Sequence, residues 1–225
     1  DNLAILGHLR THRRPGRVLL FSVEHPAVLN CAQEITRMGH KVEHIPVNKQ
    51  GVCDLSKLEA MLGEDVHLIT LMQVNNEVGA VQPIEAVCKL RDRLAPKAAI
   101  HVDGVQGFLR VPFHFGKSGV QSYAFSGHKV YAPTGTGALW GREEVLEMLP
   151  PWLGGGEMIS EVSFEKTTYN TLPFKYEAGT PDIGGNIVLA AALRYVLAGA
   201  YYRRPLNFTL TGMKDATSAL NKLGR

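Results

Sequence analysis

Two residues that could do chemistry together lie at the ends of predicted strands. Asp103 follows the apolar stretch 98–102, and Lys129 comes 26 residues later, shortly after the apolar stretch 120–125. Both stretches have the composition of buried strands. Burial of a carboxylate or an ammonium is unfavourable unless a partner compensates its charge. The pair therefore predicts a ligand that neutralises both groups.

Pyridoxal phosphate (PLP) is such a ligand, because its aldehyde forms a Schiff base with a lysine and its ring nitrogen pairs with an aspartate. Gly104 would let the backbone approach that ligand closely. The ordinary alternatives are a surface lysine in a turn rich in glycine and proline, and a carboxylate that only caps a turn. A metal site made of His101, Asp103 and His128 is a further alternative, although these residues form no tight ligand motif.

Other polar residues follow the predicted strands or flank the lysine. They are His25, Asn76, Gln106, Ser126 and His128. Ser126 and His128 could donate to phosphate oxygens at the turn of Lys129. An amide of Asn76 or Gln106 could bind the phenolic oxygen of PLP, or could serve ordinary loop structure. His25 could stack on an aromatic ring and transfer protons near neutral pH, or could begin a solvent-exposed helix.

Strands and helices alternate through the first two thirds of the chain. Strands are predicted over residues 17–23, 41–47, 66–72, 98–102, 120–125 and 137–140, and helices over residues 26–38, 55–62, 83–94 and 186–197. This order predicts an α/β fold with a mostly parallel sheet flanked by helices. Ligands of such folds bind at the carboxyl ends of the strands, where the candidate residues fall.

Composition is that of an ordinary soluble globular protein, with 45% hydrophobic residues, 20% charged residues and a net charge of +3. Neither nucleic acid nor a membrane is an expected partner, because basic residues are scattered and no apolar run reaches 18 residues. No signal peptide is recognisable. Cys31, Cys53 and Cys88 have no metal-like spacing. Cys31 and Cys88 fall in helix-like patterns, where a small buried hydrophobic residue is expected, and such cysteine usage fits a reducing cytoplasm.

Seven stretches in order resemble the cysteine desulfurase and selenocysteine lyase family, which belongs to the class V aminotransferase group of PLP enzymes. They are Glu-His-Pro-Ala-Val-Leu (24–29), Val-Asn-Asn-Glu-Val-Gly (74–79), His-Val-Asp-Gly-Val-Gln-Gly (101–107), Ser-Gly-His-Lys (126–129), Tyr-Ala-Pro-Thr-Gly-Thr-Gly (131–137), Pro-Pro-Trp-Leu-Gly-Gly-Gly-Glu-Met-Ile (150–159) and Phe-Lys-Tyr-Glu-Ala-Gly-Thr-Pro (174–181). The resemblance implies the large domain of the type I PLP fold, with a sheet of the seven-stranded type. Some stretches look more like the SufS-type branch and others like the IscS/NifS-type branch, so the subfamily stays open.

The resemblance also implies a role for each candidate. Lys129 would hold PLP, Asp103 would pair with its ring nitrogen, and His25 would stack on the ring and transfer protons. Asn76 and Gln106 would lie near the phenolic oxygen.

The phosphate would be bound by Ser126 and His128. Thr180 would reach the phosphate held by the partner subunit, since family members are homodimers with shared sites. Residues 1–198 would form the PLP-binding domain, with residues 150–185 as an irregular active-site or dimer-interface segment. Residues 199–225 would begin the small domain or be a joined segment.

The implied reaction removes sulfur from L-cysteine, giving alanine and an enzyme persulfide that passes to a sulfur-acceptor protein, for instance in iron–sulfur cluster assembly. The family's N-terminal phosphate loop and C-terminal small domain do not match any part of this sequence. Because none of the three cysteines matches the family's nucleophile, the chain by itself is expected to lack turnover. A selenocysteine lyase, a class V aminotransferase and a non-catalytic scaffold of the same fold are the alternatives.

Overall fold

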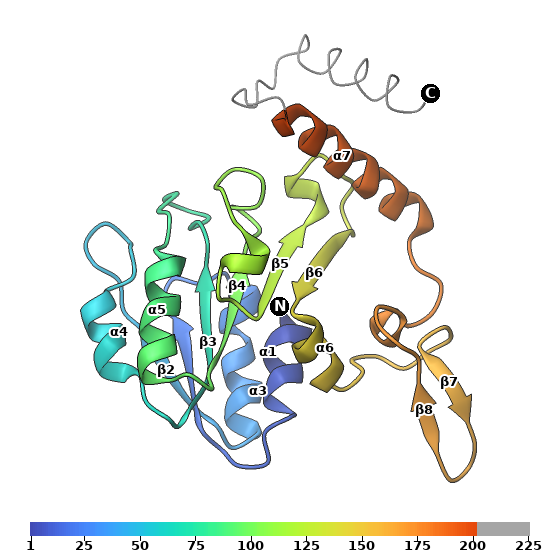
Figure 1. Ribbon diagram of the computed structural model, residues 1–225, viewed down its shortest axis with the longest axis horizontal. Helices are drawn as coiled ribbons and strands as arrows, with labels where there is room; N and C mark the ends of the chain where they lie inside the picture. The colour runs from blue at the N-terminus through green and yellow to red at the C-terminus, as the bar shows by residue number, and fades with distance from the viewer. Residues whose placement is uncertain (202–225) are drawn as a thin grey trace. The chain divides into compact units, whose positions relative to one another are not determined.

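The computed structural model describes residues 1–201, and their side chains as far as residue 196 (Figure 1). Contacts divide the chain into two compact units. The first comprises Asp1–Phe125 and Ala138–Pro181, and the second comprises Ser126–Gly137 and the chain from Asp182 onward. Part of the predicted segment 199–225, from residue 202, lies outside the described residues.

A six-stranded sheet forms the centre of the fold, with strand order β2-β1-β3-β4-β5-β6 (Figure 1). Its strands are β1 (Arg17–Phe21), β2 (Lys41–Ile45), β3 (Val66–Met72), β4 (Ala99–Asp103), β5 (Ser122–Ser126) and β6 (Gly137–Gly141). The pairs β1–β2, β1–β3, β3–β4 and β4–β5 are all parallel. The predicted α/β class and mostly parallel sheet are confirmed. The described residues provide six strands of this sheet, where the family resemblance implied a sheet of the seven-stranded type.

Helices cover both faces of this sheet. They are α1 (Asn2–Leu9), α2 (Pro26–Leu29), α3 (Cys31–Arg37), α4 (Leu55–Met61) and α5 (Ile84–Leu94). Strand β1 shows how the faces are separated, because Leu19 and Phe21 pack with α4 and α5 whereas Val18 and Leu20 pack with α1, α2 and α3. This alternation follows from the two-residue period of a strand. Burial on both faces explains why the strands read as continuous apolar runs.

Local signals set most helix ends, with one error in the prediction. Asp54 caps α4, since its Oδ1 accepts the Lys57 backbone N–H at 3.2 Å. The single helix predicted over residues 26–38 is wrong, because α2 ends at Leu29 and α3 begins at Cys31. The Cys31 thiol donates to the Ala27 carbonyl at 3.5 Å, so this carbonyl has a side-chain partner at the break.

The segment after β6 contains more regular structure than the sequence predicts. It holds α6 (Glu143–Met148) and an antiparallel hairpin of β7 (Ile159–Val162) and β8 (Thr167–Tyr169). Ser163 closes the hairpin turn, because its Oγ accepts the backbone N–H groups of Glu165 and Lys166. Serine binds turn backbone in this way more weakly than Asn or Asp, which is why the sequence signal was missed. Three short 3₁₀ turns, η1 (Phe115–Lys117), η2 (Gly127–Lys129) and η3 (Phe174–Tyr176), complete the elements outside α7.

The second unit contains η2 and the helix α7 (Ile183–Tyr201). Gly127 of η2 donates its N–H to the Thr136 carbonyl at 2.8 Å, which closes the loop that carries Lys129. Helix α7 begins three residues earlier than predicted, because the Asp182 carboxylate accepts the Gly185 N–H at 2.9 Å and the Asp182 carbonyl accepts the N–H of Asn186. Among the described residues, no helix is long and apolar enough to cross a membrane.

Four histidines gather at the amino ends of β2 and β3, away from the carboxyl ends of the strands. His12 stacks on His67 with ring centroids 3.9 Å apart, and its Nε2 lies 3.2 Å from Nε2 of His8. The His40 ring meets that of His67 edge to face. Burial lowers the pKa of each of these rings, to about 4 for His12, where repulsion from the other rings adds to the effect. The cluster is therefore built for neutral imidazoles.

Acid should destabilise the fold through this cluster. Below pH 6.5 the histidines of the unfolded chain bind protons, whereas those of the folded protein stay neutral because their pKa values are lowered. The free energy of unfolding should therefore fall from pH 6.5 toward pH 4. Each histidine can raise the unfolding constant by up to about tenfold for each pH unit that the pH is lowered, and the partly exposed His12 contributes less. Urea denaturation between pH 5 and 8 should show a weaker pH dependence in His12→Asn. The matched change at exposed His114 should leave the wild-type pH dependence, and equal slopes in all three proteins would contradict the prediction.

Candidate functional site

Asp103 is the last residue of β4 and is only 5% exposed. Its Oδ1 accepts the Val105 backbone N–H at 2.9 Å, which fixes the carboxylate against the turn that follows the strand. Its carbonyl accepts the N–H of Gln73, the residue after β3, at 2.8 Å. The carboxylate is thus held at the carboxyl edge of the sheet, where the sequence placed it.

Gly104 is required by the packing beneath this turn. A Cβ at this position would overlap the ring of Tyr123. The N–H of Gly104 donates to the Ala124 carbonyl at 2.8 Å. The Tyr123 hydroxyl in turn donates to Oε1 of the buried Gln73. Gln73 therefore supports the Asp103 turn through its backbone and through Tyr123. Sequence reasoning missed both residues, because one glutamine and one tyrosine carry no motif.

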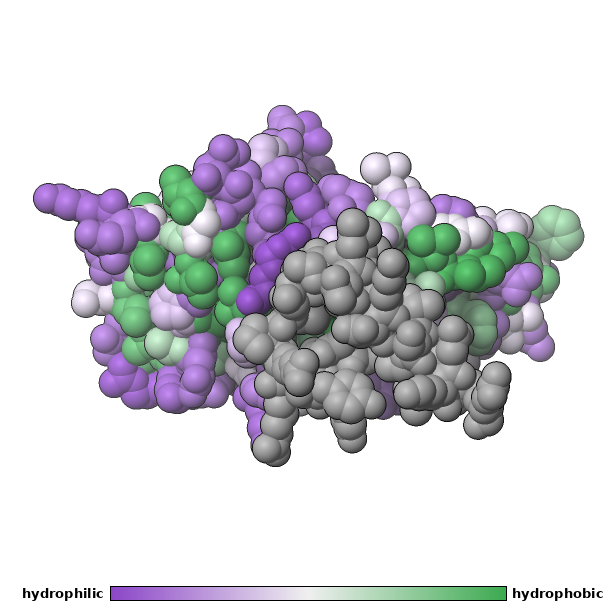
Figure 2. Space-filling view, turned by 90° about the horizontal axis from the view of Figure 1, so that it is seen from above, coloured by the Kyte–Doolittle hydropathy of each residue, from purple (hydrophilic) through white to green (hydrophobic). Residues whose placement is uncertain are grey.

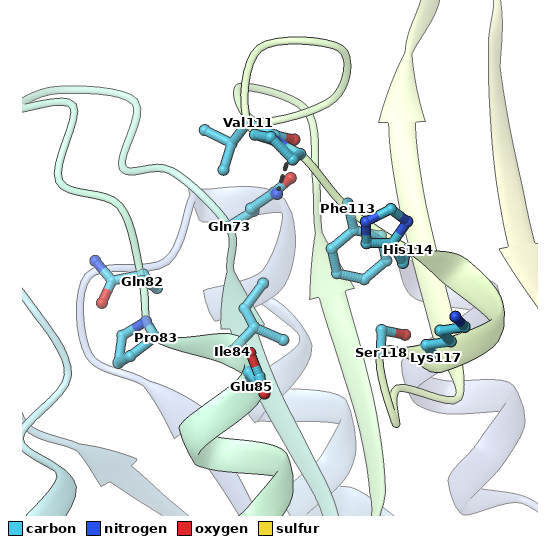
Figure 3. A pocket seen from close by; sticks show the side chains of 11 residues that line it. Gln73, Gln82, Pro83, Ile84, Glu85, Val111, Phe113, His114, Lys117 and Ser118 are labelled. Carbon is cyan, nitrogen blue, oxygen red and sulfur yellow. Dashed lines mark hydrogen bonds between the residues drawn. The ribbon is translucent and has the colours of Figure 1, made fainter.

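Gln73 also lines a pocket of about 420 Å³ (Figure 3). Its amide points toward Val111, whose carbonyl accepts from Nε2 at 3.5 Å (Figure 3). The remaining walls come from the start of α5 and from residues 112–118, and they mix apolar and polar groups: Gln82, Pro83, Ile84, Glu85, Pro112, Phe113, His114, Lys117 and Ser118. The lining of the pocket contains none of the residues predicted to bind PLP.

His25 is the N-cap of α2. Its Nδ1 accepts the Ala27 backbone N–H at 3.1 Å, and the ring is exposed. In the neutral ring the proton therefore lies on Nε2, which is a donor in this conformation. For Nε2 to accept a proton, Nδ1 would have to release the Ala27 amide. The reading of His25 as the exposed start of a helix is thus confirmed, and stacking on an aromatic ring with proton transfer stays a prediction.

Asn76 and Gln106 lie on loops after β3 and β4. Asn76 donates from Nδ2 to the Glu77 carboxylate at 2.8 Å, and its neighbour Asn75 is buried. Asn76 lines a pocket of about 710 Å³ together with Glu24 and Lys49. Gln106 is partly buried in the turn after Asp103. Both amides are at the expected edge of the sheet.

Thr180 is exposed and belongs to the first unit, near the end of its second stretch at Pro181. The N–H of Gly179 donates to the Gly156 carbonyl at 2.9 Å, and Gly155 passes so close to the Ala178 and Gly179 backbones that a side chain there would be tight. The glycine run Gly154–Gly156 therefore positions the backbone just before Thr180.

Ser126, His128 and Lys129 belong to the second unit. Ser126 ends β5, and η2 places His128 and Lys129 in the first turn after it. A Cβ at Gly127 would overlap the Thr136 hydroxyl, so only glycine fits between β5 and the lysine. Lys129 is partly buried and His128 is exposed. Lys129 therefore lies in the 3₁₀ turn directly after β5, which ends one residue later than the predicted strand.

The profile of the aminotransferase class-V family matches residues 1–204. The chain belongs to this family. A probable cysteine desulfurase of Chlamydia trachomatis is 41% identical over 184 residues, which cover 81% of this chain and 45% of the relative. A cysteine desulfurase of Dickeya dadantii is 38% identical over 200 residues, covering 88% of this chain and 48% of the relative. The chain spans about half the length of the curated relatives it matches.

Solved cysteine desulfurases share the fold of this class-V chain. The S-sulfonic acid form of CsdA from Escherichia coli superposes with a TM-score of 0.81 at 34% identity, covering 87% of this chain and 50% of that protein. The apo enzyme of Thermococcus onnurineus gives 0.80 at 33% identity, over 87% and 49%. The likeness stated from sequence motifs is confirmed by both comparisons.

All three cysteines of this class-V chain are buried and unpaired. Burial raises the pKa of the Cys53 thiol to about 12 and that of Cys88 to about 11, and it also raises the pKa of Cys31. A thiol of this kind is a poor nucleophile near neutral pH. The predicted role of Cys31 and Cys88 as small core residues is confirmed, and Cys53 is buried as well.

A metal centre receives no support from the geometry. The residues that the structure describes include no group of three or more His, Cys, Asp or Glu side chains arranged to hold a metal ion. His101 is fully buried, with its ring nitrogens engaged by Ser122 at 2.9 Å and by the Asp1 carboxylate at 3.0 Å. The ring is thus used for packing within the first unit.

Gly104→Ala should destabilise the protein, because the added methyl group overlaps the Tyr123 ring beneath the Asp103 turn. Overpacking of this kind costs about 1–3 kcal/mol. The control is Gly116→Ala, where a Cβ meets nothing within 4 Å. Urea denaturation should therefore show a clear loss of stability for the first variant alone. Equal midpoints for the two variants would mean that Tyr123 yields without strain.

Proposed function

We propose that this chain is the PLP-binding part of a cysteine desulfurase. The observation that carries the proposal is the buried carboxylate of Asp103 at the carboxyl end of β4, in a chain of the class-V family. Relatives 38% to 41% identical are named cysteine desulfurases. L-cysteine is the proposed substrate, and the solved structure named SspA in complex with cysteine, at TM-score 0.71 and 28% identity, is consistent with it.

The donor set fits PLP. Asp103 supplies a buried anion for the protonated ring nitrogen, and the close-packed Gly104 leaves the turn without a side chain. Lys129 would bind the aldehyde carbon, and Ser126 and His128 would donate to the phosphate. When bound, PLP supplies an electron sink for the pair released when a bond to the substrate Cα is broken.

Three further residues would orient the cofactor and move protons. Asn76 and Gln106 would donate to the phenolic oxygen. His25 would stack on the ring and donate a hydrogen bond from Nε2, and it could accept a proton there only after Nδ1 releases the Ala27 amide. Proton transfer by His25 would therefore be coupled to the N-cap of α2.

Sulfur transfer needs a thiolate that this set does not contain. Cys31, Cys53 and Cys88 are buried with raised pKa values, so the proposed persulfide forms on none of them. The 225-residue chain is accordingly proposed to bind PLP without desulfurase turnover. A cytoplasmic location belongs to the same proposal, because free thiols persist in a reducing compartment.

Lys129→Ala should abolish the imine absorption band of the protein mixed with PLP, because no other group is proposed to bind the aldehyde. Asp103→Asn should weaken PLP binding and reduce ring-nitrogen protonation, seen as a shift of that band. The exposed Lys117 offers a matched control, and Lys117→Ala should keep the band. A wild-type protein that never forms the band would count against the proposed function and favour a non-catalytic scaffold.

A homodimer is also proposed, with Thr180 reaching the phosphate held by the partner subunit. The segment that ends at Thr180 exposes several large apolar side chains, and hydrophobic residues are visible at the surface in Figure 2. They include Leu153, Val162, Phe164 and Phe174, and Phe164 at the hairpin turn is fully exposed. Exposed apolar groups that cluster on one segment mark interaction surfaces.

Phe164→Asp should weaken self-association by more than about tenfold, since burying a phenylalanine contributes about 1.5–3 kcal/mol. Sedimentation velocity over a concentration series measures this shift. Glu165→Gln, on the same turn, should leave the association unchanged. Dimers of unaltered affinity in Phe164→Asp would remove this hairpin from the interface.

A further inference from the structure

Glu24 is an unexplained buried acid at the edge of the sheet that holds Asp103. It lies in the turn after β1, where its N–H donates to the Phe21 carbonyl at 3.2 Å. The residue is 4% exposed, and neither carboxyl oxygen reaches solvent or makes a hydrogen bond of normal geometry. An ionised carboxylate in that position would be strongly disfavoured.

Asp103 is the charge that acts on this acid. Burial, and then repulsion from Asp103, raise the pKa of Glu24 well above its usual value. The Thr70 hydroxyl and the Met72 backbone amide, both on β3 between the two acids, offset this rise only in part. Two carboxyls that act on each other in a buried site cannot both ionise at low free energy.

The surroundings decide which of the two acids keeps the proton. The Asp103 carboxylate accepts a backbone N–H with normal hydrogen-bond geometry at 2.9 Å, whereas the Thr70 and Met72 groups near Glu24 make no such bond to its carboxyl oxygens. His101 on β4 gives no compensating charge, because burial lowers its pKa to about 3. His25 is next to Glu24 in the chain, but its ring is exposed and Nδ1 is committed to Ala27.

We propose that Glu24 is a positioning residue that carries the single proton of a carboxyl pair with Asp103, so that Asp103 alone is the anion available to a cofactor. The inference deepens the proposed function and rests on it for the identity of that cofactor. The protonated acid acts through Asp103 and touches no substrate. Its effect is to keep one negative charge at the end of β4, which matches the one positive charge of a protonated ring nitrogen.

The first test uses the protein without PLP, so that it does not depend on the cofactor. Unfolding constants of the wild type and of Glu24→Gln are measured in urea from pH 5 to 8. A proton held by folded Glu24 is lost by the unfolded chain above pH 4.5, so wild-type stability falls with rising pH relative to the variant. The ratio of the wild-type to the variant unfolding constant should rise by up to about tenfold per pH unit. A ratio that is flat or falls with pH would overturn the proposal.

The matched control is Glu64→Gln, because Glu64 is an exposed acid. The ratio of the wild-type to the Glu64→Gln unfolding constant should show no such rise with pH. If Glu24→Gln fails to fold, infrared spectroscopy of the wild type with ¹³C-labelled glutamate carboxyls gives the same answer. A protonated-carboxyl band at pH 7 supports the proposal, and its absence contradicts it.

PLP separates this inference from the proposed function. With PLP added, Glu24→Gln should keep the imine band and its ring-nitrogen protonation, while Asp103→Asn should not. If the wild type binds no PLP, the proposed function is refuted. The pH comparison of the unliganded protein would then still test the carboxyl pair of Glu24 and Asp103. Loss of ring-nitrogen protonation in Glu24→Gln would refute the positioning role.

Discussion

The parallel pairing of β3, β4 and β5 sets the position of the Asp103 carboxylate. Met72 lies opposite Asp103 on one side and Ala124 on the other. The next backbone groups continue this pairing, since Gln73 donates to the Asp103 carbonyl and Gly104 donates to the Ala124 carbonyl, each at 2.8 Å. The acid is therefore fixed by main-chain hydrogen bonds on both sides before any side chain contributes. Such a position is well suited to hold a charge that must not move when a ligand binds.

Close packing beneath Asp103 makes this position rigid. Tyr123 fills the space under Gly104 and donates to Gln73, whose amide occupies the space beside Gly107. Both glycines are there because a side chain would overlap a neighbour, and both have ordinary negative φ angles. In the segment His101–Gly107 these glycines therefore serve packing, and Gln106 is the one polar residue between them.

How far the sequence predicted this arrangement depended on the kind of signal. The strand 66–72 was predicted with its observed bounds, because an apolar run buried on both faces has clear ends. The ends of β4 and β5 shifted by one or two residues, and Asp103 proved to be inside the strand that it was expected to follow. The break between α2 and α3 left no trace in the periodicity, since Asn30 keeps helical φ and ψ angles. The roles of Tyr123 and Gln73 depend on contacts between strands far apart in the sequence, which no local pattern encodes.

Glu24 shows why burial of a charged residue escapes sequence reasoning. It precedes an N-cap histidine and a proline, a context in which an acid is normally solvated at the start of a helix. Here the turn after β1 directs it inward, because the chain must reverse from the buried Phe21 to the exposed Pro26 within a few residues. The acid then lies where β1, β3 and β4 end together, and the Asp103 charge opposes its ionisation. Since only the Asp103 carboxylate accepts a backbone hydrogen bond of normal geometry, the same fold that buries both acids also makes them chemically different.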